Sequence, residues 1–86
     1  MALVDVAPIL ARHLTVEPCE LRGPTLRDIL TKLFERNPQL RGYVLDDQGV
    51  LRKHVVIFVD GSAVRDLASS TESATEVIVM QALSGG

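Results

Sequence analysis

One amphipathic helix is the strongest local pattern in this sequence, and it limits how the chain can fold. Its apolar side chains recur at three- and four-residue intervals and form a single stripe: Leu26, Ile29, Leu30, Leu33 and Phe34. Thr25 stands before the stripe as a capping residue with Asp28 three positions on, and Asn37-Pro38 ends it. Since the rest of the chain is patterned as strands, this helix can cover only one face of a sheet.

Strand patterns occur on both sides of the helix. We expect strands at residues 3–7 and 16–21 before it and, after it, at residues 55–59, near Val64 and at residues 76–83. Residues 40–52 read as a long connection with a turn at 46–49. The first and last strands should be adjacent and parallel, because the helix and loops supply the long crossover that parallel strands need.

The expected architecture is therefore an α+β domain, with a mixed sheet of four to five strands and one main helix packed on one face. The run at 55–59 is apolar throughout and stops at Asp60-Gly61, as a central strand ending in a tight turn does. With 86 residues, we expect one domain over residues 1–83 and a flexible tail over residues 84–86.

Composition argues against several classes of function. The formal net charge is −2, which provides no basic surface for nucleic acid, and Arg52-Lys53-His54 is too short a run to change this. No segment is apolar for long enough to cross a bilayer, and the N-terminus lacks a signal-peptide pattern. We therefore expect a cytoplasmic protein, monomeric when free, that binds neither nucleic acid nor membranes.

Side chains with catalytic or metal-binding potential are few. Cys19 is the single cysteine, so no internal disulfide can form, and a packing role is the better interpretation. His13 and His54 lack ligand spacing, and Asp46-Asp47 before Gly49 indicates a turn rather than a calcium loop. No catalytic pair is visible, so we expect no enzyme activity of its own, no metal and no bound cofactor.

The carboxyl-terminal residues carry the chemistry. Ser84-Gly85-Gly86 follows the last apolar strand, and two glycines make a thin tail that can enter a narrow active-site channel. The carboxylate of Gly86 is a poor electrophile, so it needs activation as an acyl-adenylate. The activated carbonyl can then accept a sulfur nucleophile to give a thiocarboxylate, or an amine to give an isopeptide bond.

Several short motifs add a resemblance by their order along the chain. They are Pro8-Ile9-Leu10, Thr25-Leu26, Val55-x-Ile57-Phe58-Val59-Asp60-Gly61, Val64-Arg65, Val77-x-Val79 and Leu83-Ser84-Gly85-Gly86. In this order they resemble the sulfur-carrier family of MoaD/ThiS type, which includes the small subunit of molybdopterin synthase and the thiamine-biosynthesis carrier. Gly49-Val50-Leu51-Arg52 before the central strand is most similar to the branch that includes carriers for cysteine biosynthesis. One departure is the absence of an Asp-Gly turn before the last strand, where this sequence has residues 72–76.

The resemblance implies a β-grasp, or ubiquitin-like, fold and the function of a sulfur carrier. A ubiquitin-activating-type enzyme would use ATP to adenylate Gly86, a persulfide donor would supply sulfur, and a biosynthetic acceptor enzyme would receive it. The acceptor would belong to cysteine, molybdopterin or other sulfur-metabolite biosynthesis. The alternative is a protein modifier conjugated to lysines through the same tail. A third possibility is an interaction domain that uses its sheet face.

Strand alternation also predicts a docking surface for the partner enzymes. If Val55, Ile57 and Val59 face the helix, then Val56 and Phe58 face the other way. The same argument places Ile78 and Met80 on that open face, with Leu83 beside the tail. An exposed apolar patch of this kind usually marks an interaction site, unless residues 40–52 fold over it and bury it.

Overall fold

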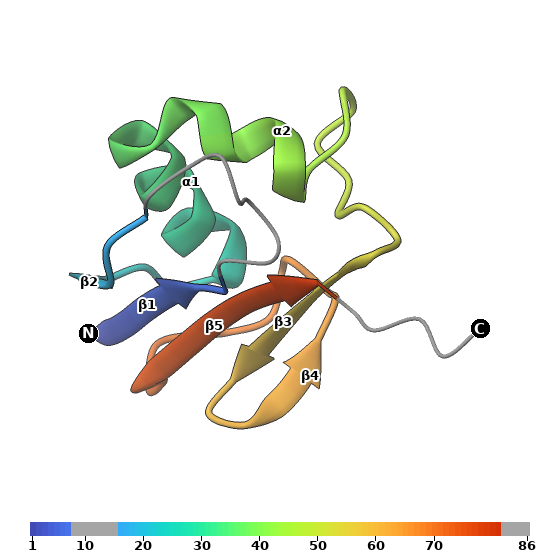
Figure 1. Cartoon of the computed structure of the whole chain (residues 1–86). Coiled ribbons are helices and arrows are strands. Elements are labelled where there is room, and N and C mark those ends of the chain that lie inside the picture. Colours follow the sequence, from blue (N-terminus) through green and yellow to red (C-terminus); the bar gives the residue numbers. More distant parts are fainter. Residues whose placement is uncertain (8–15, 82–86) are drawn as a thin grey trace.

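The computed structural model of the chain describes residues 1–7 and 16–81, and it contains one five-stranded sheet (Figure 1). The strands are β1 (Ala2–Val6), β2 (Cys19–Leu21), β3 (Val55–Val59), β4 (Ser62–Val64) and β5 (Glu76–Gln81). Their order across the sheet is β2-β1-β5-β3-β4. β1 and β5 are parallel and the other neighbouring pairs are antiparallel. The expected pairing of the first and last strands is therefore confirmed.

Helix α1 (Leu26–Arg36) packs on one face of this sheet and buries the whole predicted apolar stripe. A full capping box begins it: Asp28 N donates to Thr25 Oγ1 at 3.3 Å, and Thr25 N donates to Asp28 Oδ2 at 3.1 Å. The two preceding amides, of Leu26 and Arg27, donate to the carbonyls of Ser69 and Leu67, both at 2.9 Å. The start of the helix is thus tied to the segment that leads into β5, and its amides are satisfied.

The connection after α1 contains helical turns that the sequence analysis did not predict. A 3₁₀ turn, η1 (Pro38–Leu40), continues into α2 (Arg41–Val44). Leu40 and Val44 are fully buried in the same core as α1, which explains why the chain coils here. Four residues are too short to show a helical period, so the expectation of an irregular connection was wrong over this stretch.

Of two other expectations for local structure, one is confirmed and the other needs a correction. The turn at 46–49 is confirmed, since Asp46 Oδ1 accepts hydrogen bonds from the amides of Gln48 and Val50 at 2.9 and 3.0 Å. These bonds, with that from Val50 first, hold the pKa of Asp46 below its usual value. The second strand is shorter than expected and begins at Cys19, directly after Pro18, which has no amide hydrogen for the sheet.

The turn between β3 and β4 is joined to the start of β5 by one carboxylate. Asp60 and Gly61 both have positive φ angles, 49° and 86°, as a tight hairpin requires. Asp60 Oδ1 accepts three hydrogen bonds, from Thr75 N at 3.0 Å, Thr75 Oγ1 at 2.9 Å and Glu76 N at 2.8 Å. These bonds, with that from the Thr75 amide first, hold the pKa of Asp60 below its ordinary value of 3.8. An Asp-Gly turn from elsewhere in the chain thus stabilises the backbone where residues 72–76 lack one.

This arrangement predicts a specific acid sensitivity. Because the carboxyl group of Asp60 has a lower pKa folded than unfolded, its stabilising contribution is complete above about pH 4 and is lost as the pH falls through the folded-state pKa. Asp60→Asn keeps a hydrogen-bond acceptor and tolerates the positive φ angle, but it removes the charge. We expect urea unfolding midpoints between about pH 6 and about pH 2 to vary less in Asp60→Asn than in the wild type.

Asp47→Asn is the matched control, since Asp47 is exposed in the turn at 46–49 and its side chain accepts no hydrogen bond within residues 1–7 and 16–81. An equal flattening of the pH dependence by both substitutions would show that the hydrogen bonds of Asp60 are not its source.

Candidate functional site at the carboxyl end of the central strand

Strand β5 lies in the middle of the sheet and is held on both sides near its carboxyl end. Its register with β3 places Gln81 opposite Val55, and its register with β1 places Val79 opposite Val6. Ala7 N also donates to the carbonyl of Val79 at 2.8 Å. The last described position of β5, Gln81, therefore has a fixed place, five residues before Gly86.

The tail residues singled out in the sequence lie outside the described residues. These are Ser84, Gly85 and Gly86, together with Leu83. Pro8-Ile9-Leu10 and His13 also lie outside them. The tail boundary at residue 84 and the docking role of Leu83 therefore stay predictions.

The four other predicted docking residues come together on one face of the sheet. In the antiparallel register of β3 and β5, Val56 lies opposite Met80 and Phe58 lies opposite Ile78. Their neighbours Val55, Ile57, Val77 and Val79 are fully buried on the other face, beneath the helices. The four side chains are half-buried rather than fully exposed, because directly opposed side chains on one face partly cover each other. Val59, at the end of β3, is also only half-buried, although alternation places it on the helix side.

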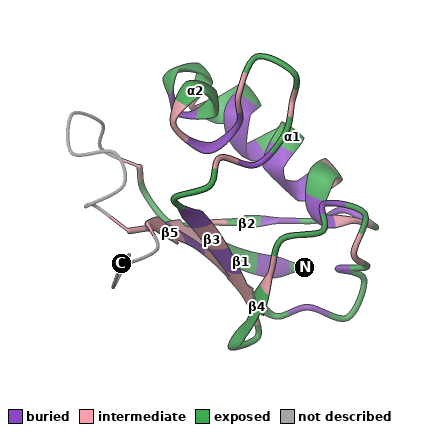
Figure 2. Cartoon of the chain, turned by 90° about the vertical axis from the view of Figure 1, so that its right-hand side faces the viewer, coloured by how far each residue is buried: buried purple, intermediate pink, exposed green. Residues whose placement is uncertain are grey.

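The connection at residues 40–52 leaves this face uncovered. Figure 2 shows α1 and α2 on the same side of the sheet. Leu40, Val44, Leu45 and Leu51 are buried in the core that α1 shares. The alternative in which this connection folds over the open face is therefore wrong, because its apolar residues are used on the helix side.

Charged groups at the edge of the open face were not predicted. Leu3, which is 44% exposed, lies opposite Glu20 of β2 and Glu76 of β5, and Asp5 lies opposite Ile78. All of these side chains lie on the open face, since Ala2, Val4 and Val6 are buried on the other. The alternation of side chains between the two faces of the strand at residues 2–6 was the signal that could have predicted this. The side of the face formed by β1 and β2 is consequently acidic.

A basic segment lies at the opposite end of the strands, where β5 runs toward the tail. Lys53 and His54 are exposed and immediately precede Val55, the partner of Gln81. The guanidinium group of Arg65 donates to the carbonyls of Val55, Leu51 and Arg52, the last at 3.2 Å. Arg65 thus fixes the loop that carries Lys53 and His54 beside the end of β5.

The described residues offer little other chemistry. Within residues 1–7 and 16–81, no three His, Cys, Asp or Glu side chains are grouped so that they could hold a metal ion. Cys19 is half-buried and packs against the core. In the same part of the chain, the helices are too short to span a membrane.

Comparison with known proteins identifies the architecture. No family model and no curated protein matches the chain. Solved structures do match, among them the small archaeal modifier protein SAMP1 from Haloferax volcanii, at 26% identity over 96% of both chains and a TM-score of 0.73. The solution structure of small archaeal modifier protein 1 from Methanosarcina acetivorans is 20% identical, with a TM-score of 0.75 over 99% of this chain and 95% of that one.

The fold is the ubiquitin-like β-grasp fold. The expected β-grasp architecture, with its mixed sheet and its main helix on one face, is thereby confirmed. A second structure of the modifier from H. volcanii agrees, at 23% identity and a TM-score of 0.73 over 93% of this chain and 94% of that one. The finer resemblance to the cysteine-biosynthesis branch stays a prediction.

The two faces of this β-grasp sheet should differ in their sensitivity to truncation. Ile57 is fully buried and Phe58, the next residue, is half-buried on the open face. We expect Ile57→Ala to lower the free energy of unfolding by about 2–5 kcal/mol and Phe58→Ala to lower it by less. In a closed core the order would reverse, because a buried phenylalanine usually loses at least as much as isoleucine. Urea unfolding of both variants at neutral pH measures the order, and the reverse order would show that Phe58 is a core residue.

Proposed function

We propose that this β-grasp protein is a sulfur carrier that works through the terminal carboxylate of Gly86. The observation that supports this most is the position of β5. It is hydrogen-bonded on both sides in the middle of the sheet and is the last strand before Gly85-Gly86. A well-anchored strand would thus lead from a defined edge of the sheet to Gly85-Gly86, two residues without side chains, as a partner's active-site channel requires. Since a fold hosts many functions, the tail and not the fold alone supports the proposal.

The chemistry begins with activation of the carboxylate. A ubiquitin-activating-type enzyme would transfer AMP from ATP to Gly86 and release pyrophosphate. A persulfide donor would then attack the acyl carbon, forming a C–S bond and displacing AMP. A second thiol would cleave the S–S bond carried over from the donor, leaving a thiocarboxylate on Gly86 and a disulfide between the donor and that thiol. An acceptor enzyme of cysteine, molybdopterin or other sulfur-metabolite biosynthesis would take the sulfur, and water would hydrolyse the acyl–sulfur bond and restore the carboxylate. We expect these steps in the cytoplasm, and the chain itself would be a co-substrate without catalytic residues.

A docking surface would hold the domain while the tail reacts. We propose that Val56, Phe58, Ile78 and Met80 form this surface. They are apolar, they share one face that no described segment covers, and they lie on β5, which precedes the tail in sequence, and on its neighbour β3. Lys53 and His54 lie where β5 ends and could contact an acidic rim on the partner.

A second candidate function is conjugation to lysines as a protein modifier. It is favoured by the names of the similar structures, which are small archaeal modifier proteins. The two functions share the acyl-adenylate and differ only in the nucleophile that follows. Intact-mass analysis of the protein from its own cells separates them. A carrier gains the mass difference between sulfur and oxygen, whereas a modifier appears joined to other proteins.

Removing Gly86 should abolish activation. The reacting carboxylate would then lie one residue too far back in the channel, and Gly85→Val should slow activation by adding a branched side chain there. ATP–pyrophosphate exchange with the cognate activating enzyme measures both effects. Gly42→Val is the matched control, because a β-carbon on Gly42 would meet no atom within 4 Å. Undiminished exchange after deletion of Gly86 would contradict both the carrier and the modifier, and would leave an interaction domain that uses its sheet face.

Truncating the open face should weaken docking. We expect Phe58→Ser and Met80→Ser each to raise the KM for this protein in the exchange assay at least about tenfold, as loss of a central apolar anchor does, with little change in kcat. Val50→Ser tests specificity, since Val50 is 55% exposed but lies in the connection on the helix side. If all three variants had the same KM as the wild type, the open face would not be the docking surface.

A further inference from the structure

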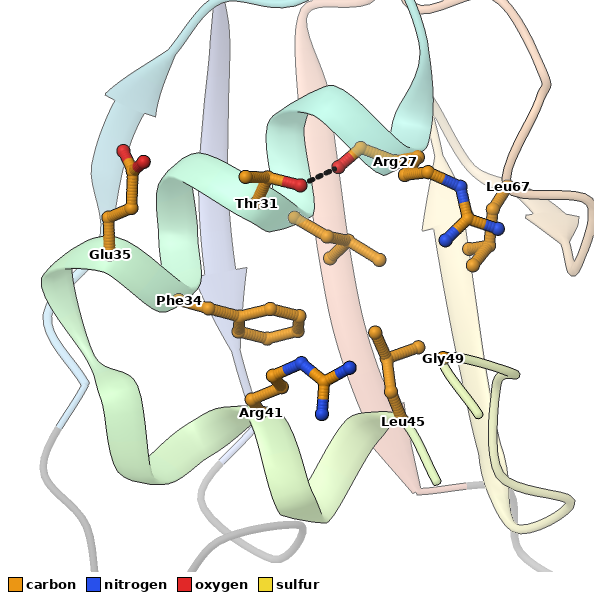
Figure 3. A pocket seen from close by; sticks show the side chains of 9 residues that line it. Arg27, Thr31, Phe34, Glu35, Arg41, Leu45, Gly49 and Leu67 are labelled. Atoms are coloured by element: carbon orange, nitrogen blue, oxygen red, sulfur yellow. Dashed lines mark hydrogen bonds between the residues drawn. The ribbon is translucent and has the colours of Figure 1, made fainter. Parts of the chain in front are cut away.

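A groove lies on the helix side of the molecule, across the sheet from the open face. One part of it is a cavity of about 300 Å³ between α1 and the connection that follows it. The floor is apolar and is formed by Leu30, Phe34, Leu45 and Leu67 (Figure 3). This volume is at the lower end of the range for ligand pockets and is sufficient for one large apolar side chain.

Two arginines border this cavity. Arg27 projects from α1 and Arg41 from the start of α2, and both are exposed. In Figure 3 the guanidinium group of Arg41 lies between Phe34 and Leu45, while that of Arg27 lies beside Leu67. Arg27 also reaches toward the turn at Gly49, since its Nη1 is 4.0 Å from the place of a β-carbon on that residue.

The groove is bordered by positive charge, whereas the net charge of the whole chain is negative. Within residues 1–7 and 16–81, neither guanidinium group donates a hydrogen bond or lies within ion-pair distance of a carboxylate. Glu35 also lines the cavity, but its carboxylate points away from the centre in Figure 3. Asp46 is close enough for the charge of Arg41 to contribute to its lowered pKa, although hydrogen bonds from Val50 and Gln48 contribute more. The cavity therefore presents two arginines in a chain whose net charge is −2.

The groove extends beyond this cavity. A second hollow of about 380 Å³ shares Arg27, Gly49 and Leu67 with it and continues to Arg65 and Asp66. An elongated groove with an apolar floor and cationic rim suits a chain segment better than a compact molecule. Charge-assisted hydrogen bonds from arginine are strongest to carboxylates, and often bidentate.

We propose that this groove binds an acidic peptide segment of a partner protein. The segment would insert one large apolar side chain between Phe34 and Leu67 and place carboxylates against Arg27 and Arg41. This inference does not depend on the chemistry of the tail. Because the groove and the open face lie on opposite sides of the sheet, a partner bound here would leave the face formed by Val56 and Met80 free.

The test is a titration of the full-length ¹⁵N-labelled chain, followed by amide chemical shifts, with three capped peptides as probes. The first is acetyl-Glu-Glu-Leu-Phe-Glu-Glu-amide. The second replaces its two apolar residues by serine, and the third replaces its glutamates by lysine. We expect the first peptide to shift the amides of Thr31, Phe34 and Gly49 in a saturable way, and the other two to bind at least about tenfold more weakly.

Variants of the two arginines test whether peptide binding depends on their charges. R27Q combined with R41Q should weaken the first peptide at least about tenfold, whereas R22Q combined with R36Q removes the same charge outside the groove and should not. All four arginines are exposed, so the fold should persist, and dispersed amide spectra verify this. Glu35→Gln should tighten binding, an effect that unfolding cannot imitate.

Three results would overturn the proposal. The first is an absence of groove shifts with the acidic apolar peptide. The second is equal binding of the lysine peptide, which would show that the apolar floor alone is recognised. The third is that inorganic phosphate produces the same shifts at similar concentration, which would identify a site for small anions rather than for a peptide.

Discussion

The hydrogen-bonded pairing of β5 with both β1 and β3 is the interaction on which the rest of this structure depends. Because β1 and β5 are parallel, the chain must cross from one end of the sheet to the other between them. The crossover includes α1, η1 and α2, and their apolar residues bury Val77 and Val79 from one side. The helices of the described residues form one layer, on one side of the sheet, and within those residues no segment covers the opposite face of β3 and β5.

The irregular segment between β4 and β5 is fixed by polar contacts instead of by secondary structure. Its carbonyls at Leu67 and Ser69 accept the first amides of α1, and the buried hydroxyl of Thr71 donates to the carbonyl of Gly23 at 2.7 Å. Gly23 itself lies so close to α1 that a β-carbon there would be 2.8 Å from that of Asp28, so only glycine fits at this position. At its far end Asp60 accepts the amides of Thr75 and Glu76. The entry to the central strand is therefore set by hydrogen bonds from two distant parts of the chain.

Local patterns in the sequence predicted most of the elements. The apolar run at 55–59 and the helical stripe at 26–34 matched the structure closely, because in each case burial and local preference agree. The helical turn at Arg41–Val44 was missed because it forms to bury Val44 and not through local propensity. The contacts of Asp60 join residues 15 and 16 positions apart, and no local pattern records them.

The two candidate sites likewise differ in how far the sequence alone could predict them. Alternation correctly placed Val56, Phe58, Ile78 and Met80 on one face, but it could not give their partial burial, which depends on cross-strand register. The groove beside Arg27 and Arg41 was not foreseen, since it exists only because the connection after α1 folds back along that helix. Short-range periodicity thus gives the faces of a sheet, whereas a groove between elements requires their packing.

The parallel alignment of β1 and β5 also has a mechanical consequence. The two strands are the first and last of the described elements, and they lie side by side with the same direction. A pull applied between the two ends of the chain therefore loads their hydrogen bonds in shear, all at once, instead of opening them one after another as in a hairpin pulled from its open end. Resistance to such forced unfolding is set by the height of the unfolding barrier. A partner that draws on the carboxyl terminus while holding the amino-terminal strand would therefore have to break the hydrogen bonds between β1 and β5 together.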